Sequence, residues 1–98
     1  MDVFATPALV ALMENAAMNA VKSALPEGST TVGAMIQTSH IKPSAVGETV
    51  KATAVLQEVD GRKLTFSVSA VDSQGAVGEG THIRYVVDRE RFLAKLKK

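Results

Sequence analysis

A hydroxyl, a carboxylate and an imidazole occupy unusual positions in this chain: Thr6, Glu14 and His40. The first precedes a proline at the start of a helical pattern, the second falls within an apolar stretch, and the third comes late in a segment with strand character. Brought together, such groups can position a water molecule, carry a proton and stabilise charge at an acyl carbon. Each also has a structural interpretation: a helix N-cap, a buried structural carboxylate, and a surface histidine at a strand end. Both interpretations stay open on these residues alone.

Glu14 is the most unusual of the three because of the helix that carries it. Residues 4–25, FATPALVALMENAAMNAVKSAL, are predicted to form one long helix with Thr6 as N-cap and Pro7 in its first turn. Its polar side chains gather in one stripe: Asn15, Asn19, Lys22 and Ser23. Glu14 lies outside that stripe, among apolar neighbours. Because an unpaired buried charge costs several kcal/mol, a carboxylate there needs a cation, a hydrogen-bond network or a reactive role.

Composition narrows the class of protein. The chain has 98 residues, enough for one domain, with a net charge of +1 and 4% aromatic residues, which does not favour a nucleic-acid or acidic-lipid surface. It has no cysteine and two histidines, which excludes disulfides and thiolate catalysis and argues against a metal site. The first helix contains charged and amide side chains and has no basic leader, so it reads neither as a secretion signal nor as a membrane span. We expect a soluble cytoplasmic protein without a metal or a cofactor.

The rest of the chain has the alternation typical of strands. Strands are predicted at residues 30–42, 48–59, 62–72 and 76–87, and Asp88 is predicted to cap a short final helix. Asp60-Gly61 predicts a hairpin turn between the second and third strands. Gly78 and Gly80 indicate a bulge or the close approach of another backbone. One face of the first strand is expected to carry Val32, Ala34, Ile36, Thr38 and His40.

These elements predict an α+β fold in which a meander of four antiparallel strands curls over one long helix. The helix is so apolar that we expect almost all of it, outside the polar stripe, to be covered. A sheet of so few strands leaves one edge and part of the helix exposed. Pairing with a second copy is the economical way to cover both, so we expect at least a dimer.

Four segments carry a resemblance to a known family. They are VFATPALVALMENA (3–16), VGAMIQTSHIKPSAVGETVKATA (32–54), DGRKLTFSVSAVD (60–72) and GEGTHIR (78–84). The most specific parts are the Ala-Thr-Pro opening that leads into ALME and a Thr-x-His motif whose histidine lies 26 residues beyond the glutamate. Over nearly its whole length the chain resembles hotdog-fold acyl-CoA thioesterases of the fluoroacetyl-CoA thioesterase type.

The resemblance implies a long helix wrapped by a curled antiparallel sheet, with two subunits joined edge to edge as a homodimer or a dimer of dimers. Active sites then lie at the dimer interface. The catalytic residues of the family fall on Thr6, Glu14 and His40, and its substrate-binding glycine and arginine fall on Gly33 and Arg84. Relatives carry a further strand and a covering loop before the Ala-Thr-Pro motif. Residues 1–98 are therefore expected to form a single hotdog domain without that strand and loop.

The leading hypothesis is hydrolysis of a short or modest acyl-CoA thioester to the free acid and CoA. Glu14 would act as a base or a nucleophile, Thr6 would attack the carbonyl or orient water, and His40 would carry the proton. The backbone N–H of Gly33 is a candidate oxyanion donor. Coenzyme A enters as part of the substrate and not as a cofactor. The alternative is a non-catalytic hotdog dimer that binds acyl-CoA or scaffolds a larger assembly.

Overall fold

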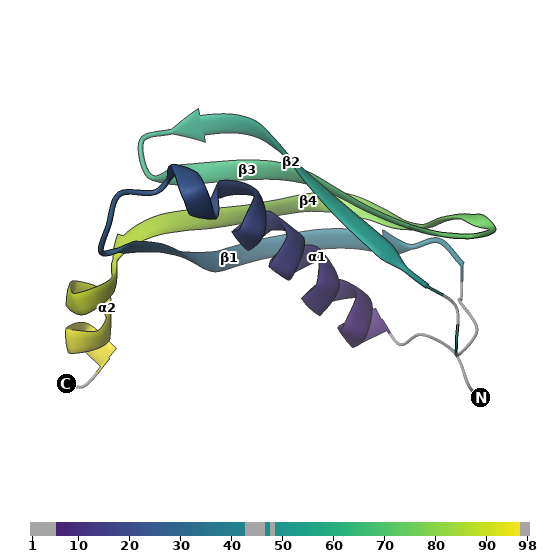
Figure 1. Ribbon diagram of the computed structural model, residues 1–98, viewed down its shortest axis with the longest axis horizontal. Coiled ribbons are helices and arrows are strands. Elements are labelled where there is room, and N and C mark those ends of the chain that lie inside the picture. The colour runs from purple at the N-terminus through teal and green to yellow at the C-terminus, as the bar shows by residue number, and fades with distance from the viewer. Residues whose placement is uncertain (1–5, 43–46, 48, 97–98) are drawn as a thin grey trace.

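The chain begins with a long helix, continues through four strands and closes with a short helix, in the predicted order (Figure 1). The computed structural model describes residues 6–42, 47 and 49–96. Within them the elements are α1 (Thr6–Val21), a 3-10 turn (Lys22–Ala24), β1 (Ser29–His40), β2 (Lys51–Asp60), β3 (Lys63–Asp72), β4 (Gly75–Asp88) and α2 (Arg89–Leu96). The first helix ends earlier than predicted because its last residues tighten into 3-10 geometry before Pro26. Its predicted start at residues 4 and 5 lies outside the described residues.

The four strands form one antiparallel sheet with the order β1-β4-β3-β2. Only β2, β3 and β4 form the predicted meander, since β1 pairs with β4 and not with β2. The connection between β1 and β2 is long enough to carry the chain to the far edge of the sheet, whereas the two hairpins hold their strands side by side. In the described part of the chain β1 and β2 are therefore the two edges.

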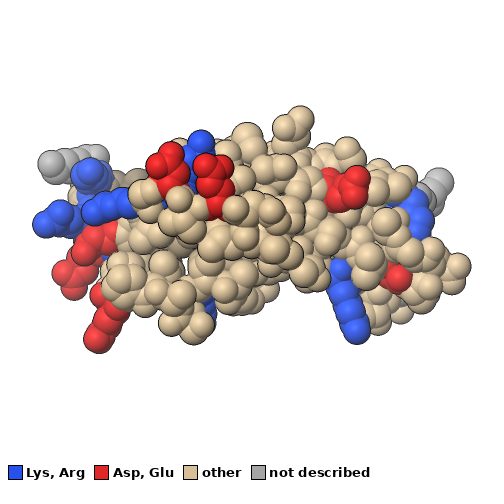
Figure 2. Space-filling model, turned by 90° about the horizontal axis from the view of Figure 1, so that it is seen from above, with Lys and Arg blue, Asp and Glu red and all other residues tan. Residues whose placement is uncertain are grey.

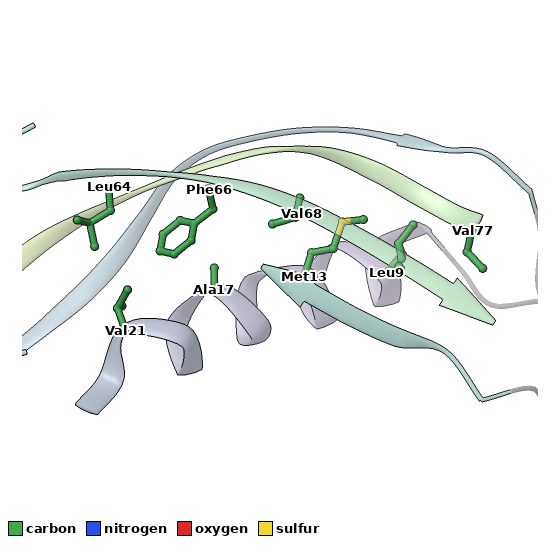
Figure 3. Packing of buried hydrophobic residues seen from close by; sticks show 9 residues of the cluster. Leu9, Met13, Ala17, Val21, Leu64, Phe66, Val68 and Val77 are labelled. Atoms are coloured by element: carbon green, nitrogen blue, oxygen red, sulfur yellow. The ribbon is translucent and has the colours of Figure 1, made fainter. Parts of the chain in front are cut away.

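The core lies between α1 and one face of the sheet (Figure 3). The helix contributes residues at i, i+4 spacing, and the strands contribute alternate residues: Leu9, Met13, Ala17, Val21, Leu64, Phe66, Val68, Ala70 and Val77. The expectation that almost the whole helix is covered is wrong for a single chain. A four-stranded sheet covers one side of a helix, and Met18 on another side stays 37% exposed.

A bulge divides β1 into two halves. Gly33 pairs with Arg84 and Met35 with Ile83, so that Ala34 is the extra residue. The extra residue reverses the alternation, and Gly33 consequently lies on the same face as Ile36 and the residues that follow it at every second position. The prediction that Ala34 shares the face of His40 is wrong for this reason, and the same shift removes Val32 from that face.

Two glycines of β4 sit where β1 passes very close. A Cβ on Gly80 would overlap the carbonyl oxygen of Gln37, and one on Gly78 would lie 2.9 Å from the carbonyl oxygen of Ser39. The predicted close approach of another backbone is confirmed, since any side chain there would force β1 away from β4.

The turns follow the predicted chemistry with one shift in position. Asp60 pairs with Lys63, so the two residues of the hairpin turn are Gly61 and Arg62, one position later than predicted. Gly61 has φ 59°, a left-handed conformation that glycine adopts without strain. Asp88 caps α2 as predicted, because its Oδ1 accepts a hydrogen bond of 2.9 Å from the backbone N–H of Arg91.

Charged side chains of both signs lie mainly toward the two ends of the molecule in the view of Figure 2, with an uncharged surface between them. No helix in the described ranges combines the length and apolar character that crossing a membrane requires.

Candidate active site

Glycine 33 marks the point where three elements converge. A Cβ at this position would lie 3.0 Å from Oε2 of Glu14, 3.4 Å from Nη1 of Arg84 and 3.5 Å from Cε1 of His82. The carboxylate comes from α1, the glycine from the edge strand β1, and the guanidinium and imidazole from β4. The structure therefore brings together three of the predicted site residues, Glu14, Gly33 and Arg84.

This convergence depends on the sheet register and on the absence of a side chain. Gly33 and Arg84 are paired across β1 and β4, which places both on the face that α1 covers. The bulge after Gly33 is what keeps it on that face together with the second half of the strand. Since glycine has no Cβ, a small space remains between the half-buried Glu14 carboxylate and the Arg84 guanidinium.

Arg84 carries a charge but is only 7% exposed, and hydrogen bonds fix its guanidinium in place. Its Nε donates to Oγ1 of Thr31 at 2.8 Å, and its Nη2 donates to the carbonyl oxygen of Thr31 at 2.9 Å. Its Nη1 lies 3.3 Å from Nε2 of His82. Burial lowers the pKa of Arg84, and the negative charge of Glu14 opposes that shift. Among the described residues these two charges face each other without closing into a salt bridge.

His82 belongs to this cluster and was not among the predicted site residues. It is 1% exposed, its Nδ1 lies 2.8 Å from the carbonyl oxygen of Met35, and its ring stacks on Phe66 with centroids 6.3 Å apart. The sequence contained one signal for it. In a strand, a residue two positions before Arg84 shares the face of Arg84, and that residue is His82.

His40 and Thr6 are placed differently from the cluster. His40 pairs with Gly78 at the end of β1, about 20 Å along the strand from Gly33, with Nε2 of its ring shielded from solvent. Within one chain it does not meet Glu14. Thr6 begins α1, about 12 Å along the helix axis from Glu14, and its side chain lies outside the described part of the structure.

The arrangement around Gly33 offers a defined chemistry. A carboxylate faces a small space floored by glycine backbone, and a fixed guanidinium borders the same space. A carboxylate can abstract a proton from water or attack an electrophilic carbon, and a fixed cation can stabilise an oxygen that becomes negative. These are the requirements of acyl transfer.

Comparison with known proteins identifies the family of the chain. The family model described as fluoroacetyl-CoA-specific thioesterase matches residues 1–90. The fluoroacetyl-CoA thioesterase of Streptantibioticus cattleyicolor is 41% identical over 96 residues, which cover 98% of this chain and 69% of that protein.

Solved structures show the same relationship. A variant of the fluoroacetyl-CoA-specific thioesterase in complex with fluoroacetate and CoA superposes with a TM-score of 0.93 at 41% identity, covering 97% of this chain and 74% of that one. A hot-dog-like protein from Thermanaerovibrio acidaminovorans superposes with a TM-score of 0.91 at 26% identity, covering 97% and 70%. The chain therefore has the hotdog fold and belongs to the fluoroacetyl-CoA-specific thioesterase family, a family of acyl-CoA thioester hydrolases.

Proposed function

We propose that this protein hydrolyses a short acyl-CoA thioester in the space over Gly33, with Glu14 as the reacting carboxylate and His40 supplied by a second subunit. The observation that carries the proposal is the position of Gly33, where the Glu14 carboxylate and the Arg84 guanidinium both lie within 3.4 Å of the point that a Cβ would occupy. Fluoroacetyl-CoA is the first candidate substrate, because the relatives described above are named for it.

Two routes use these groups. In one, Glu14 takes a proton from water, and the resulting hydroxide adds to the carbonyl carbon before the CoA thiolate departs. In the other, the Glu14 carboxylate adds to the carbonyl carbon, the thiolate departs, and water then hydrolyses the mixed anhydride. Thr6 orients the water or attacks in place of Glu14, and His40 returns a proton to the leaving sulfur.

The negative oxygen formed in either route needs a donor that is already in place. Arg84 supports this role because its guanidinium is fixed by Thr31 and faces the space over Gly33. The Gly33 backbone N–H is the second candidate donor, since a backbone without a side chain lets the substrate approach closely.

The position of His40 supports a site shared between two subunits. β1 is a sheet edge among the described strands, and an edge invites antiparallel pairing with a second copy. We propose that the two-fold axis of this pairing lies near Gln37, which would put Ile36 opposite Thr38 of the partner subunit. Beyond the bulge, the same pairing would put Gly33 opposite His40 of the partner subunit. Each site then combines Glu14, Gly33 and Arg84 of one subunit with the imidazole of the other.

A groove beside the cluster suits the CoA portion of the substrate. It has a volume of about 570 Å³ and runs between α1, the start of β1 and α2, with Met18, Val32 and Phe92 among its apolar lining. Thr31, which holds Arg84, also lines it, so the groove adjoins the space over Gly33. Lys22 and Arg89 are cations of the same groove that suit the phosphates of CoA.

Thiol release from a panel of acyl-CoAs tests the activity. Fluoroacetyl-, acetyl-, butyryl- and benzoyl-CoA are incubated with the protein, and the short esters are expected to be hydrolysed fastest. A folded protein that binds the esters without releasing thiol above background would overturn the proposal in favour of a non-catalytic acyl-CoA-binding dimer.

Mixing two inactive variants tests the shared site. Glu14→Gln and His40→Ala are each expected to be inactive, whereas after subunit exchange a mixed dimer has one site with both residues intact. Random exchange makes half the dimers mixed, so about a quarter of parental activity should return. If no activity returns although the subunits have exchanged, the two residues act within one chain or not at all.

A further inference from the structure

His82 is the buried polar residue of the cluster that the proposed reaction leaves without a role. Its imidazole is 1% exposed and lies between the Met35 carbonyl and the Arg84 guanidinium. We infer that His82 is a positioning residue, whose neutral Nδ1–H tautomer holds Arg84 so that its guanidinium borders the reaction space without collapsing onto Glu14. The inference rests on the proposed roles of Glu14 and Arg84.

The tautomer follows from what the two neighbours can do. A carbonyl oxygen can only accept, so Nδ1 of His82 must donate its proton to Met35. A guanidinium nitrogen can only donate, so Nε2 must accept from Nη1 of Arg84. Stacking on Phe66 fixes the plane of the ring. His82 is thereby fixed as an acceptor directed at Arg84, and an imidazolium could not fill this role.

The contact matters because of which nitrogen it holds. Thr31 accepts from Nε and Nη2 of Arg84 but makes no contact with Nη1, the guanidinium nitrogen nearest the space over Gly33. Oε2 of Glu14 borders the same space. Without an acceptor on the far side of Nη1, the guanidinium can tilt toward the carboxylate. A direct ion pair would then occupy the space of the substrate carbonyl and neutralise the reacting carboxylate.

Two amide substitutions separate the two hydrogen bonds of His82. In His82→Asn the amide nitrogen takes the place of Nδ1 and can still donate to Met35, but no group reaches Arg84. In His82→Gln the longer side chain places its amide oxygen where Nε2 was, so that it can accept from Arg84 while the donor to Met35 is lost. A positioning role predicts that Asn lowers kcat about 10-fold with little change in KM, whereas Gln retains most of kcat.

A double-mutant cycle and a spectrum complete the test. Since His82 acts through Arg84, His82→Asn should cause no further loss of kcat in the Arg84→Met background. In nitrogen-15 spectra of the substrate-free protein, the Arg84 Nη protons, identified by their disappearance in Arg84→Met, should be resolved in the parent and in His82→Gln. In His82→Asn the Nη1 protons should shift from their parental positions, because Nη1 then donates to the Glu14 carboxylate and no longer to His82.

Several results would overturn the inference. These are equal kcat in the Asn and Gln variants, an Asn effect of the same size with and without Arg84, or Nη1 proton resonances that keep their parental positions in His82→Asn. If the Asn variant does not fold, the Gln variant decides alone, and a kcat as low as that of Arg84→Met would count against the role. The spectrum needs no turnover, so a parent without thioesterase activity would refute the proposed function while the Arg84 contact is still tested.

Discussion

The two ends of β1 differ in the reactive side chains that lie beside them. At the Gly33 end, carboxylate, guanidinium and imidazole are assembled within one chain. At the other end His40 pairs with Gly78, against which Leu9 of α1 packs. The first end sets a carboxylate near a guanidinium and holds its own imidazole between the Met35 carbonyl and Arg84, whereas the second end presents the imidazole of His40. An edge strand that pairs antiparallel with a second copy is the simplest way to unite them.

The bulge at Ala34 puts Gly33 and His40 on the same face of β1. An unbroken strand places Gly33 and His40 on opposite faces, since seven positions separate them. The extra residue restores a common face for both ends. One irregular position therefore decides whether Gly33 and His40 lie on the same face of the strand.

The largest effect is expected at the Gly33 end. Glu14→Gln keeps the shape of the side chain and removes the basic and nucleophilic oxygen, so kcat should fall by about two orders of magnitude or more. Asn15→Ala, the neighbouring exposed position, is the control and should stay near parental activity. Steady-state thiol release measures both, and a Glu14→Gln enzyme within a few-fold of the parent would remove Glu14 from the reaction.

A smaller loss is expected at the His40 end. His40→Asn preserves some hydrogen bonding but cannot carry a proton, so kcat should fall by about 10- to 100-fold. Ser39→Ala lies on the opposite face of the strand and should have little effect. Equal losses in these two variants would indicate that this end of β1 serves only in packing or pairing.

Alanine substitutions at Gly33 and Gly80 should have different effects, because only Gly33 lies beside Glu14 and Arg84. Gly33→Ala brings a Cβ to 3.0 Å from the Glu14 carboxylate, the end of a flexible side chain, so the protein should fold while kcat/KM falls about 10-fold. Gly80→Ala places its Cβ against backbone atoms of Gln37 and Thr38, so it should melt far below the parent. Similar melting temperatures for the two variants would contradict this distinction.

Local signals in the sequence predicted the elements well. Pro7 and Pro26 bracket the first helix, and Gly61 marks the hairpin within one position. The alternation of β3 predicts the residues that form the core, Leu64 and Phe66 among them. Each of these signals acts over a few residues, which is why it can be read from the chain directly.

Features set by distant parts of the chain could not be predicted in this way. The pairing of β1 with β4 depends on how a long connection runs, and no residue type marks Ala34 as a bulge. The site roles of Gly33 and Arg84 were predicted from the family resemblance. His82 was missed because strand alternation predicts the face of the sheet on which a residue lies and not the residues that it contacts. A network buried by tertiary packing becomes visible only when the strands are in register.

The smallest effect is expected at a point remote from both ends of β1. Asp88→Ala removes the N-cap of α2, which should cost about 1 kcal/mol of folding stability. For a domain of this size the melting temperature should fall by about 4–8 °C. The substitution leaves Glu14, Gly33 and Arg84 untouched, so kcat of the folded enzyme should stay at the parental value. Because Phe92 and Arg89 of α2 line the groove proposed for CoA, fraying of the helix should raise KM slightly.

Calorimetry measures the expected fall in melting temperature, and steady-state kinetics measure kcat and KM. A fall in kcat with unchanged KM would show that α2 supports the reaction space and not the groove.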